Sequence, residues 1–520
     1  MDDADGAPAR AGLVLGALIV GALVCNINLA VANVALPDIG TALDASQTAL
    51  TLVAVGCTLG LAMSVLYFGA VGDRYGRTLM LKLGLGLTVV TAPLCAWAPS
   101  APVLVVGRLL TGLAAGMAYP TTLALVTALW ADGPRRVKAI ALWSGVGGSA
   151  MVLGPTAAGA LLERFWWGSV FLVVVPLALI GLVLVVVAVP AHANESTEPV
   201  DHSGGVMTVA MIATVVLGLS LVTAPGRLAI ALALLVVGAL VTVAFFRHER
   251  RTENPLYDLH VAARRMFWVP AVSGMIVFGS LSGAMFIGQQ FLQNVLDYST
   301  FRAGLAVLPA ALGLMIVAPV SARLVVSVGS RITMLIGFAF IVPAFVVMLV
   351  TWREGALGVW VGVAYLLIGL GAGTALTPAS QSLTASVPVR RVGMASGTSD
   401  LQRDLGGSVM QAILGALLTA GYASTFTSLV SSSPQASRVT DQTRSALLQS
   451  YSSAATLAKA TPAFQDQIVA AARQSFLAGS DWAFLAAIVA ALGGILLVVC
   501  CLPGHAEERA LLAGYADADV

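Results

Sequence analysis

Runs of about twenty apolar residues, each long enough to cross a bilayer as one helix, recur along this chain and constrain its fold more than any other feature. Of its 520 residues, 58% are hydrophobic and only 10% are charged. Soluble globular domains do not have this composition. The sequence therefore predicts an all-α polytopic membrane protein.

Fourteen candidate membrane spans can be delimited. Two of them, on either side of a tight Ala-Pro-Gly turn at 224–226, lie between polar connections at 190–205 and 247–266. The fourteen spans are Gly12–Leu36, Thr48–Val71, Thr78–Trp97, Val103–Trp130, Ala139–Leu162, Gly168–Val189, Val206–Thr223, Leu228–Phe246, Phe267–Leu296, Ala303–Val328, Ile332–Thr351, Gly355–Pro378, Val392–Ala420 and Trp482–Leu502.

Arginine and lysine gather in alternate connections, which predicts the orientation. By the positive-inside rule the basic side is cytoplasmic. Both termini are then expected in the cytoplasm, with the chain in the cell inner (plasma) membrane. The residues concerned are Arg74, Arg77, Lys82, Arg135, Arg136, Lys138, Arg247, Arg250, Arg251, Arg264, Arg265, Arg331, Arg390 and Arg391.

The segment 422–481 is polar and falls on the predicted outer side. Its apolar residues recur at helical spacing on both sides of Pro462. This pattern predicts an outer helical hairpin, and the alternative is a flexible loop.

Three charged residues, Asp400, Arg403 and Asp404, lie inside the apolar run 392–420. Each opposes insertion by roughly 2.5–3.5 kcal/mol, so such groups are kept for a function or an ion pair. The two acids are four residues apart and share a helix face. Arg403 can reach Asp400, whereas it lies about 100° around the helix from Asp404. Our hypothesis is that Arg403 holds Asp400 and that Asp404 is freer to exchange a proton. The alternative is a buried cluster that only fixes packing.

Glycine-rich motifs carry further charges in the first half of the chain. A tight turn with one carboxylate and two guanidiniums follows span two, and it suits a charge latch between helices. Arg108 lies inside span four, where a charge is costly, and small residues let neighbouring helices approach. The motif residues are Gly69, Gly72, Asp73, Arg74, Gly76 and Arg77 after span two; Arg108, Gly112 and Gly116 in span four; and Gly145, Gly154, Pro155 and Gly159 in span five.

The turn after span two matches the signature G-x-x-x-D-R-x-G-R, and the chain resembles the major facilitator superfamily. Span five resembles the antiporter motif of drug:proton antiporters, with Ala158 in place of a usual glycine. The stretches 33–37, 292–309 and 369–378 are similar to the fourteen-span branch. Asp400 and Asp404, followed by Leu-Gly, resemble the exporters of quaternary ammonium compounds, which also have a large outer loop before the last span.

The resemblance implies an alternating-access fold with two six-helix bundles and two extra linker helices. Residues 1–189 would form the N-terminal bundle and 190–266 the linker with its two helices. Residues 267–520 would form the C-terminal bundle, including the hairpin 422–481 and a cytoplasmic tail at 503–520. Asp73 would then pair with a basic group and hold the outward-open form.

The chain departs from the family in its first half. Asn28 stands where the family often has an aspartate, and an apolar residue near Val55 replaces an acid of some relatives. This concentrates proton coupling on Asp400, Arg403 and Asp404. The polar side chains proposed to line the substrate cavity are Asn28, Asn33, Gln289 and Gln293.

These observations predict a proton-coupled exporter of amphipathic drugs, cationic or neutral, that acts as a monomer without a cofactor or metal. The rival function is a same-fold exporter of a self-made antibiotic or other secondary metabolite. An enzyme or ATP-driven pump is disfavoured because the chain has no phosphate-binding loop and no H-E-x-x-H motif. A receptor would need a large soluble domain, and a net charge of +2 argues against nucleic acid as a partner.

Overall fold

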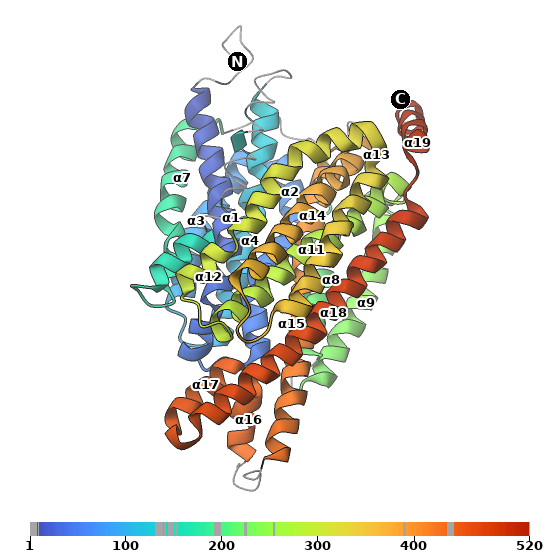
Figure 1. Cartoon of the computed structure of the whole chain (residues 1–520). Coiled ribbons are helices and arrows are strands. Elements are labelled where there is room, and N and C mark those ends of the chain that lie inside the picture. Colours follow the sequence, from blue (N-terminus) through green and yellow to red (C-terminus); the bar gives the residue numbers. More distant parts are fainter. Residues whose placement is uncertain are drawn as a thin grey trace.

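The computed structural model describes residues 10–130, 154–191, 199–222, 226–252, 255–387, 392–433 and 441–518, together with residues 8, 139, 142, 143 and 150. All regular elements within these residues are helices (Figure 1). Twelve helical stretches of the described chain are long and apolar enough to cross a membrane. The predicted all-α membrane fold is confirmed.

The helices before the linker pack together, α2 against α4 and α3 against both α4 and α7. Their bounds are α1 Ala11–Ala42, α2 Gln47–Tyr75, α3 Arg77–Ala96, α4 Ala101–Leu129, α6 Ser169–Leu172 and α7 Val174–Ala188. The linker helices are α8 His202–Leu221 and α9 Leu228–Glu249.

The remaining helices form a second group, in which α13 packs on α14 and α11 and α18 pack on α15. Contacts of α2 with α15 and of α1 with α11 join the two groups. The bounds are α10 Leu259–Ala262, α11 Arg265–Asn294, α12 Thr300–Ala306, α13 Leu308–Thr351, α14 Gly358–Ala385, α15 Val392–Ser432, α16 Asp441–Gln449, α17 Tyr451–Ala460, η3 Pro462–Phe464, α18 Gln465–Cys501 and α19 His505–Ala518.

Predicted spans ten and eleven appear as one element, α13. Gly329 divides it, because its φ of 86° and ψ of 168° are not helical. The two predicted spans therefore lie on either side of a break that only a glycine accommodates easily. Nearly half of span five lies outside the described residues, and 154–162 are helical.

Small residues set the distance between helices. A Cβ added to Gly112 of α4 would lie 2.8 Å from the Cα of Gly60 in α2. In the second group, a Cβ on Gly371 of α14 would lie 2.8 Å from the carbonyl oxygen of Gly337 in α13. Without side chains between them, these backbones meet directly, which is the expected packing for membrane helices.

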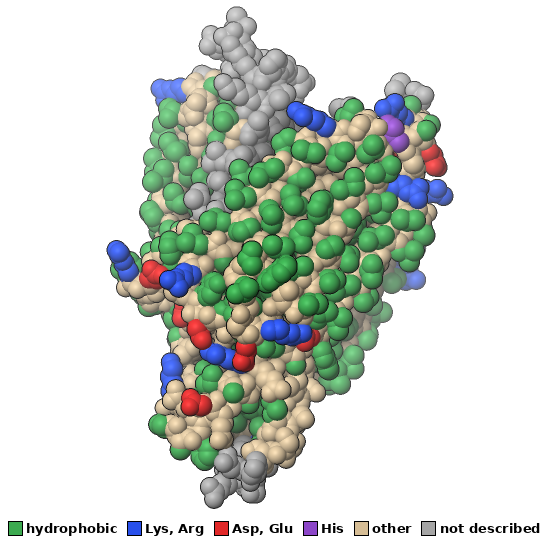
Figure 2. All heavy atoms as spheres, viewed as in Figure 1, with side chains coloured by type: hydrophobic (Ala, Val, Ile, Leu, Met, Phe, Trp, Pro, Cys, Tyr) green, Lys and Arg blue, Asp and Glu red, His purple; other side chains and the backbone are tan. Residues whose placement is uncertain are grey.

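The starts of α1 and α19 lie at one end of the bundle and α16 and α17 at the other (Figure 1). We call these the terminus end and the hairpin end. Figure 2 shows hydrophobic side chains over the broad middle of the visible face, with charged side chains towards its margins. This distribution suits a surface that meets lipid between two aqueous layers.

The separate helices between the last two membrane helices cover a shorter stretch than the predicted hairpin 422–481. α15 continues to Ser432 and α18 already begins at Gln465. Both membrane helices therefore continue into the predicted hairpin segment, and α16 and α17 form the connection between them. Ser450 Oγ donates to the carbonyl oxygen of Ala45 (3.1 Å), so this connection packs on the loop between α1 and α2.

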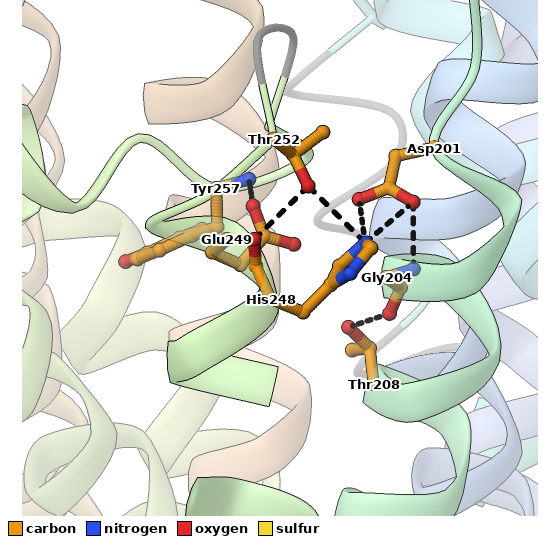
Figure 3. A network of polar contacts seen from close by, with 7 residues as sticks. All are labelled: Asp201, Gly204, Thr208, His248, Glu249, Thr252 and Tyr257. Carbon is orange, nitrogen blue, oxygen red and sulfur yellow. Dashed lines mark hydrogen bonds and ion pairs between the residues drawn. The ribbon is translucent and has the colours of Figure 1, made fainter. Parts of the chain in front are cut away.

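A polar network fastens the linker helices at the terminus end (Figure 3). His248 Nε2 of α9 lies 2.9 Å from Asp201 Oδ2, which precedes α8. Glu249 accepts a hydrogen bond from the backbone N–H at 257, on the way to α11 (3.0 Å). Tyr67 of α2 lies with its hydroxyl 2.9 Å from His202 Nδ1. The Tyr67 contact holds the linker to the first helical group, and α8 also packs on α15 of the second group.

Candidate functional site

Arg403 lies between the two acids of α15. Its Nε is 3.6 Å from Asp404 Oδ1, and its Nη2 is 4.0 Å from Asp400 Oδ1. The predicted ion pair of Arg403 with Asp400 is present, but the arginine also contacts Asp404, and it is closer to Asp404 than to Asp400. Asp404 is the next residue in the helix, about 100° around it, and the long, flexible arginine side chain can span that angle.

The two carboxylates differ in burial. The Asp404 side chain is 1% exposed and that of Asp400 is 24% exposed. Asp404 Oδ2 has no hydrogen-bond partner among the described residues. A buried carboxylate with only one occupied oxygen is costly when ionised, and a proton on that oxygen would remove the cost.

Tyr119 of α4 brings the other helical group to this cluster. Arg403 Nη1 donates to its hydroxyl (3.0 Å), and the guanidinium carbon lies 4.7 Å from the ring centroid. The ring of Phe278 in α11 lies 5.9 Å away on another side. Arg403 therefore bridges α15 and α4, which belong to different groups.

Glycine lets α15 pack closely against α11. A Cβ on Gly406 would lie 2.7 Å from the Cα of Met275, and one on Gly279 would lie 2.6 Å from the carbonyl oxygen of Gly406. Asp404 lies two residues before Gly406, about 200° around the helix, so its side chain is on the other side of α15 from this contact. Asp404 is twelve residues from the start of α15, or about 18 Å along the helix.

Arg108 of α4 is fully buried. Its Nη1 donates to the carbonyl oxygen of Asn28 (2.8 Å) and its Nε to that of Val53 (3.3 Å), while Nη2 is unpartnered among the described residues. The guanidinium ties α4 to α1 and α2. Gly112 and Gly116 on the same helix face pack against α2, the latter beside Ser64.

The turn after α2 contains an ion pair within itself. Arg77 Nε donates to Asp73 Oδ1 at 2.7 Å, and the Asp73 side chain is 43% exposed. Gly76 has a φ of 118°, which favours glycine. Gly72 packs beside Met80, Gly69 has open space around it, and Arg74 lies in the same turn.

The antiporter motif lies between helical groups where it is described. A Cβ on Gly154 would lie 3.0 Å from that of Ala30 in α1, and one on Gly159 would lie 2.7 Å from the Cα of Phe301 in α12. The carbonyl oxygen of Pro155 faces Gly304 in the same way. Gly145 lies outside the described residues.

The four polar cavity candidates lie in or beside the contact between α1 and α11. Asn28 is 2% exposed, and Gln289 donates to the carbonyl oxygen of Ala303 (3.2 Å). Gln293 donates to the carbonyl oxygen of Val34 (2.9 Å), and Asn33 Oδ1 is buried without a partner among the described residues.

The hairpin end is closed by contacts between the two groups. Gln47 of α2 donates to Gln290 of α11 (3.1 Å), and Gln293 reaches α1 as above. Ser453 of α17 donates to Asp44 Oδ1 in the loop after α1 (3.1 Å). This polar seam was not predicted, because glutamine and serine give no sequence signal for partners in a distant segment.

No group of three or more His, Cys, Asp or Glu side chains in the described parts of the chain could hold a metal ion. Tyr119 is the residue of the central cluster that sequence reasoning missed. It lies 284 residues from Arg403, and its position in span four resembles that of any buried aromatic side chain.

Comparisons with known proteins agree with this geometry. A family model described as the Major Facilitator Superfamily matches residues 18–411. The multidrug efflux pump LfrA of Mycolicibacterium smegmatis is 31% identical over 507 residues, which are 96% of this chain and 97% of that protein. The tetracenomycin C resistance and export protein of Streptomyces glaucescens is 28% identical over 429 residues, 81% of this chain and 79% of that protein.

Among solved structures, a bacterial homolog of the human lysosomal transporter Spinster, in its inward-facing and unoccupied conformation, aligns with a TM-score of 0.61. The alignment covers 98% of this chain and 99% of that one at 15% identity, so it bears on the fold alone. The family model spans most of the membrane helices, and LfrA matches nearly end to end. The chain belongs to the Major Facilitator Superfamily, in its drug-efflux branch.

Proposed function

We propose that this transporter exports amphipathic small molecules, cationic or neutral, across the plasma membrane in exchange for protons. One relative named as a multidrug efflux pump and another named as a multidrug resistance protein support export of drugs. The observation that carries proton coupling is the Arg403 cluster, in which a buried carboxylate with one free oxygen touches a guanidinium that binds the other helical group.

The mechanism follows from competition for Arg403. An ionised Asp404 attracts the guanidinium of Arg403. At the same time, the Nη1 of Arg403 donates a hydrogen bond to the hydroxyl of Tyr119. A proton on Asp404 removes that attraction and frees Arg403 to strengthen or leave its contact with α4. Asp400, which is partly exposed, would pass protons or contact the substrate. The two acids would titrate as a coupled unit.

Alternating access would move residues 1–189 against residues 267–520, with 190–266 as a linker and the chain acting as a monomer. We place both termini in the cytoplasm, so that the hairpin end faces outwards. The closed hairpin end then corresponds to an inward-facing state. In that state Asp73 pairs with Arg77 inside its own turn and would be available to hold the opposite, outward-open state.

A second candidate function is export of a self-made antibiotic, and the similarity to the tetracenomycin C exporter favours it. Both functions use the same proton site, and only the substrate differs. A panel of quaternary ammonium dyes and aromatic polyketides, tested for competition against one fluorescent substrate, would separate the two.

The decisive experiment is transport into everted vesicles energised by respiration. Uptake of a lipophilic cation should depend on this protein and collapse on addition of a protonophore. Uptake that is unchanged by the protonophore would refute proton exchange, and the absence of uptake across the whole panel would refute the exporter function.

A further inference from the structure

The C-terminal helix α19 folds back onto the break in α13. Glu508 is 7% exposed, and its carboxylate accepts hydrogen bonds from the backbone N–H (3.0 Å) and the hydroxyl (2.5 Å) of Ser330. A Cβ on Gly329 would lie 2.8 Å from His505 Nδ1 and 2.9 Å from Glu508 Oε2. The glycine therefore makes room for α19 as well as for the break.

The first half of the chain has the same turn with its own carboxylate. Gly76, with φ 118°, divides α2 from α3 as Gly329, with φ 86°, divides α13. Asp73 stands three residues before Gly76, and Val326 stands three residues before Gly329. Val326 is 71% exposed and carries no charge. The second turn thus lacks an acid at the position where the first has one.

In each half, the chain that leaves the last membrane helix of that half covers this turn. In the first half, Thr78 donates to the carbonyl oxygen of Pro190, which follows α7 (2.7 Å). In the second half, Glu508, which follows α18, covers the turn at Ser330, one residue after Gly329, whereas Thr78 stands two residues after Gly76. A carboxylate is favourable there because a helix begins at Ser330 and its unpaired N–H groups carry partial positive charge.

The contact extends from Ser330 into α14 and the linker. Ser382 of α14 donates to Ser330 Oγ (3.0 Å). Arg264, just before α11, donates to the carbonyl oxygen of Ser386 (2.6 Å) and lies 4.6 Å from the ring centroid of Tyr515 in α19. One helix outside the bundle therefore joins the break in α13, the end of α14 and the start of α11.

We propose that Glu508 is a positioning residue for transport: from the C-terminal helix it supplies the carboxylate that the turn at Gly329 lacks, and so keeps α13 and α14 together at the terminus end while the two halves move. This inference rests on the transport function proposed above.

The test compares Glu508→Gln, Ser330→Ala and their double variant with Glu507→Gln. Glu507 is the adjacent glutamate and is exposed, so it is a matched control. Initial efflux rates are measured over a range of substrate concentrations at equal membrane levels, beside substrate binding by purified protein. Glu508→Gln and Ser330→Ala should each lower the maximal rate several-fold with KM and binding unchanged, and the double variant should be no worse than the stronger single one. Glu507→Gln should match wild type.

A wild-type maximal rate in Glu508→Gln would overturn the proposal, as would additive losses in the double variant. A Glu508→Gln variant in which substrate binding, the midpoint of thermal unfolding and the transport rate all fall together would also overturn the proposal. That result would mean that Glu508 only stabilises the fold. If the transport function itself were wrong, wild type and Glu507→Gln would show no efflux either, so the two failures are distinguishable.

Discussion

Replacement of Asp404 by asparagine tests the proton site most directly. Asparagine keeps the size and hydrogen-bonding capacity of the side chain and removes its ability to lose a proton. Unit charges 3.6 Å apart, as Asp404 and Arg403 are, attract by roughly 5 kcal/mol at an effective dielectric constant of 20. Removing the carboxylate also removes an insertion cost of roughly 2.5–3.5 kcal/mol.

The difference leaves a net loss of roughly 1.5–2.5 kcal/mol, and Arg403 keeps its contacts with Tyr119 and Asp400. The variant should therefore fold and reach the membrane. Its transport should change far more. A monovalent cation exchanged for one proton moves no net charge, so its gradient follows the pH difference alone, about tenfold per pH unit. In Asp404→Asn this accumulation should vanish.

The assay uses proteoliposomes with an imposed pH gradient and a fluorescent monovalent cation. Exchange of labelled for unlabelled substrate needs no proton and should persist in Asp404→Asn, which shows that the protein is intact. Asp400→Asn should lose only part of the accumulation. A pH-driven gradient of wild-type size in Asp404→Asn would refute the assignment of the proton to this residue.

Two further substitutions and one shortened variant test the turn after α2, the cavity position 28 and the outer segment. Asp73→Asn should slow transport with little loss of substrate binding, and a parallel fall in binding would place this residue outside the conformational switch. Asn28→Asp should shift an efflux profile towards more highly charged cations, whereas an unchanged profile in a folded variant would assign residue 28 to packing. Replacing residues 433–462 by a short linker should leave the bundle folded, because loop length has a small entropic cost. Efflux of several cations should then fall or change in selectivity, and wild-type efflux of every one would reduce the segment to a tether.

The membrane helices could be predicted because each one is a long apolar run whose solvent is the bilayer itself. The turn at Gly76 could be predicted for a similar reason, since its charges and glycines are neighbours in the chain. The ends of α15 and α18 could not be. Alanine, serine and threonine continue α15 beyond Ala420 without a stop signal, and the helical spacing after Pro462 belongs to α18 itself.

The arrangement of the central cluster depended on tertiary contacts. Which of Asp400 and Asp404 is buried depends on the rotation of α15 about its own axis. The close packing of Gly406 on Met275 and Gly279 of α11 helps to set that rotation. The role of Tyr119 requires α4 to cross α15. A helical pattern fixes which residues share a face, but it does not fix which other helix that face meets.

The seam at the hairpin end has a consequence for the environments in which the transporter can work. Its contacts between Gln47 and Gln290, from Gln293 to α1 and from Ser450 to the loop after α1 join neutral groups. The contact of Ser453 with Asp44 Oδ1 involves a carboxylate. Hydrogen bonds of this kind contribute about 0.5–1.5 kcal/mol each, which is comparable with the roughly 2.3 kcal/mol that one charge gains across 100 mV. Neutral contacts are not screened by ions. Opening at this end should therefore respond to the salinity outside the cell mainly through the contact at Asp44, and its equilibrium can be shifted by single protons.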